Sequence, residues 1–326
     1  MIWILLISAA VVILLDFLLR KYAKFRIADM FENVPPFNVT TAAENPNARR
    51  LSIHSASGLT LSGSLLWPQD HAPHGLVIFF PELNGNHWMA SRYCEGLLQN
   101  GFAVLGFDFR NQGESDCDPA YSPIHWITDY EMQDVEAVLE FIESDPEFST
   151  MPLLAFGVSR GGVAALIAGS RYPRIRAVIA DSAFGTLPMM HHFVNRFVRL
   201  VIPGWLYALL PWWHIRIALR QGIQVSQKRR HCRYLHLEDE ASGLSETPVL
   251  LISGQRDSYV TQEVAAALHS TVGEHSELWT VEKAKHNMAR SVQPQEYDRR
   301  VVEHAFRALD IRQVEPQEVS ALGESN

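Results

Sequence analysis

Five short, almost wholly apolar runs, separated by longer segments of helical pattern, constrain the fold of this chain more than any other feature. They cover 75–80, 102–107, 153–156, 177–179 and 249–252. Continuous apolar runs of this length are typical of strands buried on both faces of a parallel sheet. Between them, 131–142 places apolar residues on one side of a helix, and 163–169 is helical and rich in small residues. This alternation predicts an α/β fold, a mostly parallel doubly wound sheet with helices on both faces.

Two half-buried strands are predicted to precede this pattern. The segments 51–54 and 60–66, separated by Ser57-Gly58, are expected to pair as an antiparallel hairpin. The α/β domain is therefore predicted over 51–311. The tail 312–326 is polar, acidic and without periodicity, so we expect it to be disordered.

The first 20 residues predict a transmembrane anchor. Residues 2–19 are apolar except for Ser8 and Asp16, and basic side chains follow them at Arg20, Lys21, Lys24 and Arg26. A cleaved signal peptide would carry its basic residues before the apolar core, so this order favours an uncleaved span. The positive-inside rule then predicts that the domain lies on the cytoplasmic side. Asp16 lies near one end of the span, where its side chain can reach the membrane interface. We therefore expect the membrane to tolerate its charge there and assign it no functional role.

Residues 21–50 are predicted to be a linker. This segment contains Pro35-Pro36 and Asn45-Pro46 and has little apolar periodicity after Ala28. The linker would connect the anchor to the domain.

Charge and cysteine content exclude several classes of function. The formal net charge is -8, and the body of the chain has no block of Lys or Arg, so we expect no nucleic-acid partner. The three cysteines, Cys94, Cys117 and Cys232, form neither a disulfide framework nor a zinc pattern and favour a reducing compartment. His191-His192 has no further ligands at zinc spacing, so no metal and no cofactor is predicted.

The sequence Gly157-Val-Ser159-Arg-Gly161 carries the strongest functional signal. It lies directly after the apolar run 153–156 and directly before a predicted helix. A G-x-S-x-G turn in a strand-turn-helix context presents its serine as a nucleophile, because the two glycines leave no side chain to clash. We therefore predict that Ser159 is the nucleophile and that the backbone N–H of Arg160 points at a developing oxyanion.

With this motif, residues 51–309 resemble the α/β-hydrolase superfamily, in which the catalytic acid and histidine follow the serine in that order. Asp257, in the segment Ile252-Ser-Gly254-Gln-Arg-Asp257, matches the acid loop, and His286 matches the base. Asp181 is a rival acid, ranked second. The rival histidines are His269, His275 and His304. The resemblance implies a serine hydrolase that works through an acyl-enzyme.

The loop after the run 75–80 resembles the superfamily's H-G-N-x-G-N segment, with the N–H of Leu83 as second oxyanion donor. The sequence departs from this pattern because Pro81 and Glu82 replace His and Gly. A later segment, 107–115, resembles D-x-R-x-x-G-x-S. We expect it to brace the active-site loops through a pair between Asp108 and Arg110 and a turn at a glycine.

A helical cap is predicted over 185–246, where the superfamily carries a variable insertion. Its apolar residues are Met189, Met190, Phe193, Phe197, Val198, Trp205, Leu206, Tyr207, Trp212, Trp213 and Ile215, and its basic residues are Arg196, Arg199, Arg216, Arg220, Lys228, Arg229 and Arg230. The apolar side chains either form an acyl pocket or membrane surface, or pack the cap onto the core. The basic side chains are interpreted as solvated helix faces, with anionic headgroups or an acidic leaving group as the alternative.

Three hypotheses follow. The first is a membrane-tethered hydrolase of esters, thioesters or lysolipids, and the second is a serine peptidase with the same triad. The third is a non-catalytic protein of the same fold that binds a ligand or partner, for which Pro81-Glu82 is the best support. Dehalogenase chemistry needs a carboxylate at the position of Ser159 and is excluded.

Overall fold

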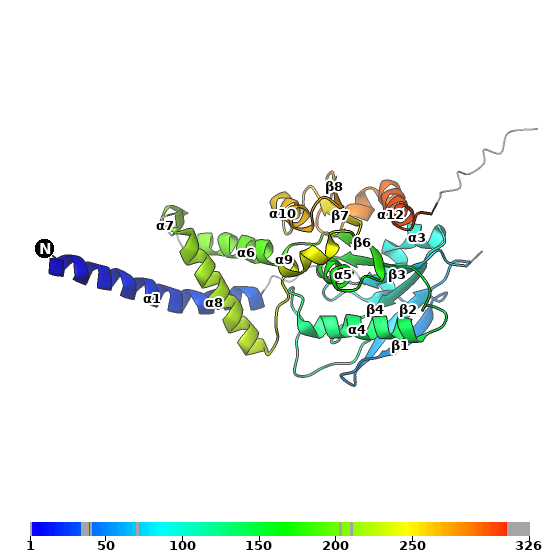
Figure 1. Cartoon of the computed structure of the whole chain (residues 1–326), viewed down its shortest axis with the longest axis horizontal. Coiled ribbons are helices and arrows are strands. Elements are labelled where there is room, and N and C mark those ends of the chain that lie inside the picture. The colour runs from blue at the N-terminus through cyan, green and yellow to red at the C-terminus, as the bar shows by residue number, and fades with distance from the viewer. Residues whose placement is uncertain are drawn as a thin grey trace, which may run out of the picture.

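A computed structural model describes residues 2–33, 39, 41–69, 72–201, 204–208 and 211–311 of the chain. Within these residues eight strands form one sheet in the order β1-β2-β4-β3-β5-β6-β7-β8 (Figure 1). The strands are β1 (Arg49–His54), β2 (Thr60–Leu66), β3 (Leu76–Phe80), β4 (Ala103–Phe107), β5 (Leu153–Val158), β6 (Ile175–Asp181), β7 (Val249–Gly254) and β8 (Ser276–Val281). The pairs β1/β2 and β2/β4 are antiparallel, and the other neighbours are parallel. The predicted α/β fold is confirmed, and each of the five apolar runs overlaps one of the strands β3 to β7.

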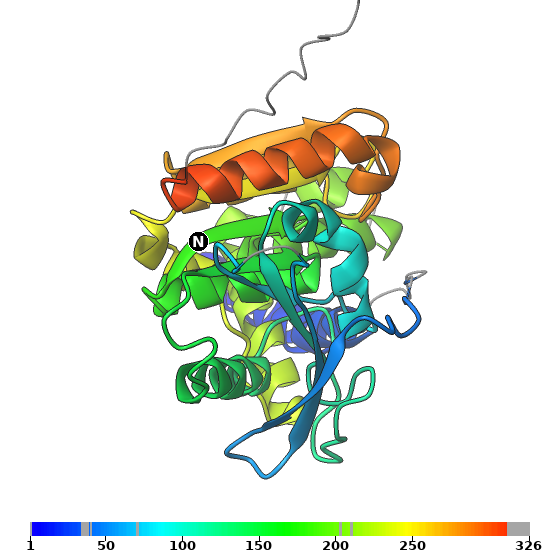
Figure 2. The same ribbon diagram turned by 90° about the vertical axis from the view of Figure 1, so that its right-hand side faces the viewer.

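Helices cover both faces of the sheet because the strands are apolar on both sides. One core includes Leu76, Ile78 and Phe80 of β3, and the other includes Val77 and Phe79. The first face is covered by α4 (Asp129–Ser144), α5 (Arg160–Arg171) and α10 (Gln262–Val272). The second is covered by α2 (Ala90–Tyr93), α3 (Glu95–Gln99), α11 (Ala289–Val292) and α12 (Pro294–Ala308), and Figure 2 shows α12 running across this side. A short helix, η1 (His87–Met89), precedes α2.

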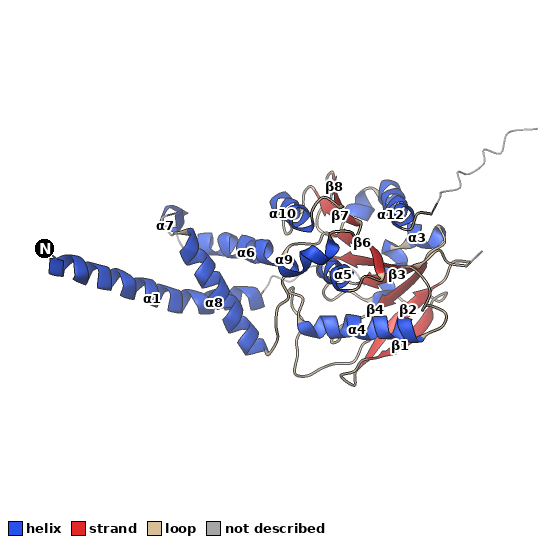
Figure 3. Ribbon diagram, in the orientation of Figure 1, coloured by secondary structure: helices blue, strands red, loops and turns tan. Residues whose placement is uncertain are grey.

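Between β6 and β7 the chain leaves the sheet and forms the cap. Its helices are α6 (Thr186–Val201), α7 (Gly204–Ala208), α8 (Trp212–Arg230), α9 (Leu237–Glu240) and η2 (Ala241–Leu244). In Figure 3 the strands all lie in the body of the molecule, whereas α6, α7, α8 and α1 (Ile2–Glu32) form a helical arm that projects from it. Residues 202–203 and 209–210 of the predicted cap lie outside the described residues.

The helix α1 continues well beyond the predicted anchor, which corrects the first part of the predicted linker over 21–50. Ile27, Ala28 and Phe31 are buried because α8 packs along this part of α1. The Phe31 ring lies 5.8 Å from that of Trp126, whose indole N–H donates to the Phe31 carbonyl at 3.2 Å. Residues 21–32 therefore belong to the packed structure. The domain's first strand also begins at Arg49, slightly before the predicted start at Leu51.

The first part of α1 leaves its apolar side chains uncovered. Large side chains from Ile2 to Leu19 are exposed, and α1 is the one helix among the described residues that is long and apolar enough to cross a membrane. A signal sequence near an N-terminus has the same length and composition. Residues 34–38 and 40 of the predicted linker and the predicted tail 312–326 lie outside the described residues.

Candidate active site

The serine of the G-x-S-x-G motif lies at a strained corner between β5 and α5. Ser159 has φ 52° and ψ -119°, a left-handed conformation that few residues other than glycine adopt. A Cβ on Gly157 would lie 2.2 Å from the Gly161 carbonyl oxygen, so the turn closes only with glycine at this position. The Ser159 N–H donates to the Asp181 carbonyl at 2.7 Å. The turn therefore projects the Ser159 hydroxyl beyond the carboxyl ends of the strands.

Three residues from separate loops at this edge form one chain of hydrogen bonds. Ser159 Oγ lies 3.0 Å from His286 Nε2, and His286 Nδ1 lies 2.7 Å from Asp257 Oδ2. Asp257 follows β7 and His286 follows β8, so the parallel sheet brings them to the edge where β5 delivers the serine. The second carboxylate oxygen of Asp257 accepts the backbone N–H groups of Tyr259 and Val260 at 2.7 and 2.9 Å. This arrangement holds the imidazole with one nitrogen on the carboxylate and the other on the hydroxyl.

The alternative candidates for the acid and for the histidine contact other residues. Asp181 is buried and accepts hydrogen bonds from the Tyr297 and Ser182 hydroxyls at 2.8 and 2.9 Å. Burial raises the pKa of Asp181 to about 6. His269 bonds Ser276 at 2.7 Å, and His304 is buried in α12. Among the described residues the Ser159 hydroxyl is hydrogen-bonded to His286, and not to the side chain of Asp181, His269, His275 or His304.

The two backbone N–H groups predicted as oxyanion donors, those of Leu83 and Arg160, lie on neighbouring segments. The strands β3 and β5 are parallel neighbours, so the loop after Phe80 reaches the same edge as the serine. A Cβ on Gly161 would lie 2.1 Å from the Phe80 carbonyl oxygen and 2.5 Å from that of Pro81, so α5 begins in direct contact with this loop. Within the described residues, neither the Leu83 N–H nor the Arg160 N–H donates to another group outside helical pairing. The role of these two N–H groups as oxyanion donors stays a prediction of the sequence.

Glu82, one of the two departures from the superfamily pattern, joins the loop after β3 to the loop that carries His286. Its carboxylate accepts a hydrogen bond from the side chain of Asn287, the residue after His286. The Asn287 N–H donates to Ser182 Oγ at 3.2 Å, and its carbonyl accepts the Tyr93 hydroxyl at 3.2 Å. Burial raises the pKa of Glu82 to about 7, although the His286 charge and the Asn287 hydrogen bond oppose the rise. The sequence indicated Glu82 only as a departure from the superfamily pattern and did not indicate Asn287. Glu82 directly precedes Leu83, and Asn287 directly follows His286.

The segment after β4 braces these loops, but not through the predicted pair of Asp108 with Arg110. Asp108 instead accepts the His87 backbone N–H at 2.6 Å and lies 2.8 Å from the His87 ring nitrogen. A Cβ on Gly113 would lie 2.0 Å from Asp108 Oδ2, which explains the glycine at this positive-φ turn. Asp108 therefore connects the segment after β4 to the start of η1.

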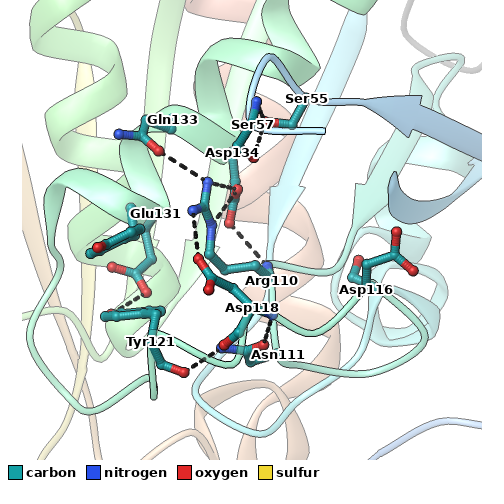
Figure 4. Close-up of polar contacts among 12 residues, drawn as sticks. Ser55, Ser57, Arg110, Asn111, Asp116, Asp118, Tyr121, Glu131, Gln133 and Asp134 are labelled. Atoms are coloured by element: carbon teal, nitrogen blue, oxygen red, sulfur yellow. Dashed lines mark hydrogen bonds and ion pairs between the residues drawn. The ribbon is translucent and has the colours of Figure 1, made fainter. Parts of the chain in front are cut away.

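Arg110 contacts other residues, and Figure 4 shows it directed at Asp134, Gln133 and Asp118. Its guanidinium donates to Asp134 of α4 at 2.7 and 2.8 Å and lies 3.6 Å from Asp118. Burial raises the pKa of the Asp134 carboxyl to about 6, against the lowering effect of Arg110. The two side chains therefore serve different contacts, Asp108 with His87 and Arg110 with Asp134 of α4.

A second buried ion pair involves Arg160, the residue directly after Ser159. The Arg160 side chain points into the protein, pairs with Glu131 and lies 5.5 Å over the Phe109 ring. Glu131 also accepts the Thr128 N–H at 2.9 Å and the Tyr121 hydroxyl at 2.6 Å. Arg160 thus connects the first residue of α5 to the start of α4, a role that the sequence did not indicate.

Aromatic side chains lie above the histidine on the cap side. The Tyr259 ring lies 5.2 Å from His286 and 5.2 Å from Phe193 of α6. Phe193 in turn stacks on Phe197 at 5.9 Å and contacts Trp126 at 6.0 Å. The environment between the histidine and the cap is therefore apolar. The described residues contain no group of three or more side chains that could hold a metal ion.

Comparisons with known proteins agree with this geometry. The family model "Serine aminopeptidase, S33" matches residues 71–241, more than half of the chain. The Pyrococcus furiosus esterase Pf2001 is 24% identical with a TM-score of 0.61, and the match covers 84% of this chain and 97% of that one. The α/β hydrolase GrgF from Penicillium sp. sh18 is 16% identical with a TM-score of 0.59, covering 81% and 99%.

The esterase domain of a Rhodothermus marinus protein shares the fold as well. It is 19% identical with a TM-score of 0.52, and the match covers 80% of this chain and 98% of that one. At these identities the solved structures support the α/β-hydrolase fold, and the family model supports hydrolase activity. The chain therefore belongs to the serine aminopeptidase S33 family of α/β hydrolases.

Proposed function

We propose that the chain is a membrane-tethered serine hydrolase that cleaves an acyl ester or thioester through an acyl-enzyme on Ser159. The observation that carries this proposal is the continuous chain of hydrogen bonds from Ser159 through His286 to Asp257. The substrate is a lipid-like or small acyl compound. The aromatic side chains between His286 and the cap favour an apolar acyl group.

In the first half of the reaction His286 Nε2 takes the proton of Ser159 as the serine oxygen attacks the acyl carbonyl carbon. Asp257 holds the ring in the required tautomer and stabilises the imidazolium. The N–H groups of Leu83 and Arg160 stabilise the oxyanion. The imidazolium then protonates the leaving alcohol or thiol, and the acyl group stays on Ser159.

In the second half a water molecule replaces the leaving group. His286 takes a proton from the water as its oxygen attacks the acyl-enzyme, and then returns that proton to Ser159 Oγ. The acyl–oxygen bond to Ser159 breaks and a free carboxylic acid leaves. The reaction consumes one water, and the described residues named above supply every proton transfer.

Peptide hydrolysis is the second candidate, favoured by the description of the matching family as serine aminopeptidases. The triad serves ester and amide bonds equally, so only the leaving group distinguishes the two functions. A non-catalytic binding protein is the third candidate, and it requires that Ser159 be unreactive.

The membrane tether is part of the proposal. The exposed apolar side chains of α1 support a span through residues 2–19. Basic residues from Arg20 onward support a cytoplasmic position for the hydrolase domain, as do the three cysteines, which are unpaired.

Fluorophosphonate labelling of the full-length protein in detergent, measured by intact mass, tests the proposed activity. We expect one adduct on the wild type and none on Ser159→Ala or His286→Ala. The matched control is Ser270→Ala, which removes an exposed serine on α10 and should keep the adduct.

Absence of an adduct on the folded wild type would refute the serine-hydrolase proposal and favour the binding protein. Acyl esters of a fluorescent hydroxycoumarin and aminoacyl amides of the matching aminocoumarin then separate the first two candidates. Faster cleavage of the amides would overturn the preference for esters.

A further inference from the structure

The cap helix α8 is joined to α1 at three levels along its length. His214 Nδ1 lies 2.7 Å from Asp16 Oδ1, in the first turn of α8. A Cβ on Gly222 would lie 2.3 Å from Ile27 Cγ2, so the two helices touch where only glycine fits. Arg229 donates to Asp29 at 2.8 Å near the far end. Because residue numbers rise together on both helices, α8 runs in the same direction as α1.

This register fixes the depth of the cap relative to the proposed span. Asp16 lies three residues before the end of the segment 2–19, or about 5 Å at 1.5 Å per residue. It pairs with both Arg20 and His214. The first turn of α8 therefore lies level with the end of the span, where hydrocarbon gives way to headgroups.

The neighbouring part of the cap carries exposed tryptophans. Trp205 of α7 is 69% exposed and Trp213 of α8 is 45% exposed. In Figure 1, α7 and the start of α8 are the part of the cap farthest from the sheet, on the side toward which α1 extends. Tryptophan favours the membrane interface because its ring is apolar and its N–H is polar. Here α7 and the first turn of α8 are called the cap tip.

Basic side chains lie at the level that headgroup phosphates would occupy. Arg216 and Arg220 are exposed on α8, within two turns of Trp213. Arg20, Lys21 and Lys24 lie on α1 just after the span. Positive charge beside interfacial tryptophans suits a phospholipid surface.

The helix α6 connects the cap tip to the site. It begins at Thr186 close to the sheet and ends at Val201 beside α7 (Figure 1). Its Phe193 and Phe197 rings continue the aromatic contact that starts at His286 and Tyr259. Apolar side chains therefore lie between the catalytic edge and the tip.

We propose that the cap tip lies in the interfacial region of the bilayer that α1 enters, and that the site takes a lipid ester directly from that leaflet. The delivery of substrate rests on the proposed hydrolase function. The membrane contact rests on the register of α8 with α1 and is tested separately.

Tryptophan quenching tests the membrane contact. The full-length protein is placed in vesicles of phosphatidylcholine and phosphatidylglycerol, with and without phosphatidylcholine brominated near the headgroup end of its acyl chains. We expect the double variant Trp205→Phe/Trp213→Phe to lose part of the quenching, because Phe removes the fluorophore but keeps the apolar ring. The control Trp67→Phe removes a tryptophan of the body, 36% exposed, and should lose none. Equal quenching in the wild type and the double variant would overturn the contact.

Two esters of one fluorescent alcohol test the delivery of substrate. These are 4-methylumbelliferyl oleate held in the vesicles and the acetate dissolved in water. For Trp205→Glu/Trp213→Glu we expect the oleate rate to fall about tenfold, because charge weakens insertion of the tip. The acetate rate should stay unchanged. The Phe double variant should keep both rates.

The outcomes separate this inference from the proposed function. An unchanged oleate rate in the Glu double variant, with an active wild type, overturns delivery through the tip. A wild type that cleaves neither ester and takes no fluorophosphonate overturns the hydrolase function, and the quenching result still decides the membrane contact.

Discussion

The carboxyl edge of the sheet and the helical arm of α1, α6, α7 and α8 are built in different ways. At the sheet edge the side chains are held by hydrogen bonds to side chains and to the backbone. Asp257, for example, contacts His286 with one oxygen and two backbone N–H groups with the other. In the arm, polar contacts between α1 and α8 are few, and tryptophans at the cap tip are exposed.

This difference in contacts corresponds to a difference in what the two regions are proposed to do. A catalytic edge loses function when a group moves by a fraction of an ångström, so backbone contacts and hydrogen bonds determine its geometry. The arm needs an environment that covers apolar surface, and the bilayer supplies it in our proposal. The predictions below test whether the two regions differ in the way this comparison requires.

The largest effect is expected at the carboxylate that holds His286. Asp257→Asn should lower kcat about 10⁴-fold, because an amide favours the wrong imidazole tautomer. Asp181→Asn changes the rival carboxylate in the same way and should cost far less activity. Steady-state hydrolysis of a soluble ester measures both variants.

If Asp181→Asn instead causes the larger loss, the assignment of the acid is wrong. Circular dichroism of both variants shows whether either loss comes from unfolding. This check matters most for Asp181→Asn, since Asp181 is buried and accepts a hydrogen bond from Tyr297.

Matched glycine substitutions compare the packing of the two regions. Gly161→Ala places a methyl group 2.1 Å from the Phe80 carbonyl oxygen, whereas a Cβ on Gly204 of α7 meets none of the described residues within 4 Å. We expect Gly161→Ala to lower the free energy of unfolding by about 3 kcal/mol. It should also slow fluorophosphonate labelling about 10²-fold, because it displaces the loop of Leu83. Gly204→Ala should change stability by less than about 1 kcal/mol in thermal unfolding, and equal effects would contradict the comparison.

The sheet and the nucleophile turn could be predicted because their signals are local. A strand buried on both faces is apolar throughout, and Gly157 and Gly161 surround Ser159 within five residues. Asp257 and His286 followed from a resemblance in chain order, and the structure brings them together with Ser159. Their catalytic roles stay predictions until the variants are measured.

The contacts that the sequence did not indicate join segments far apart in the chain. The continuation of α1 to Glu32 depends on α8, which begins at Trp212. The buried pair of Arg160 with Glu131 depends on how α5 packs against α4. Pattern and propensity describe one segment at a time, so they cannot report which distant segment covers it.

Glu82 should make stability depend on pH. Burial raises its pKa in the folded protein to about 7 from an ordinary value of 4.5. The folded protein therefore keeps a proton that the unfolded chain loses, and the resulting stability is complete below pH 4.5 and lost as pH rises to about 7. At about 1.4 kcal/mol per pKa unit the loss is about 3 kcal/mol.

Glu82→Gln should remove this part of the pH dependence, measured by denaturant unfolding at several pH values. Asp181 and Asp134, whose pKa values burial raises to about 6, keep their own contribution in both proteins. The informative quantity is thus the difference between wild type and variant. The control Glu246→Gln, at an exposed position, should follow the wild type. A variant that keeps the wild-type slope would show that Glu82 is ionised in the folded protein.

The smallest effect is expected in the arm, at the pair of Asp16 with His214. A double-mutant cycle of Asp16→Asn and His214→Ala, measured by unfolding of vesicle-bound protein, should give a coupling energy of about 1 kcal/mol. The cycle of Asp29→Asn and Arg229→Gln, at the more exposed end of the same helix pair, should give less and should vanish at high salt. If salt weakens both pairs equally, Asp16 lies in water. The span would then end before Asp16, and the cap tip would stand clear of the bilayer.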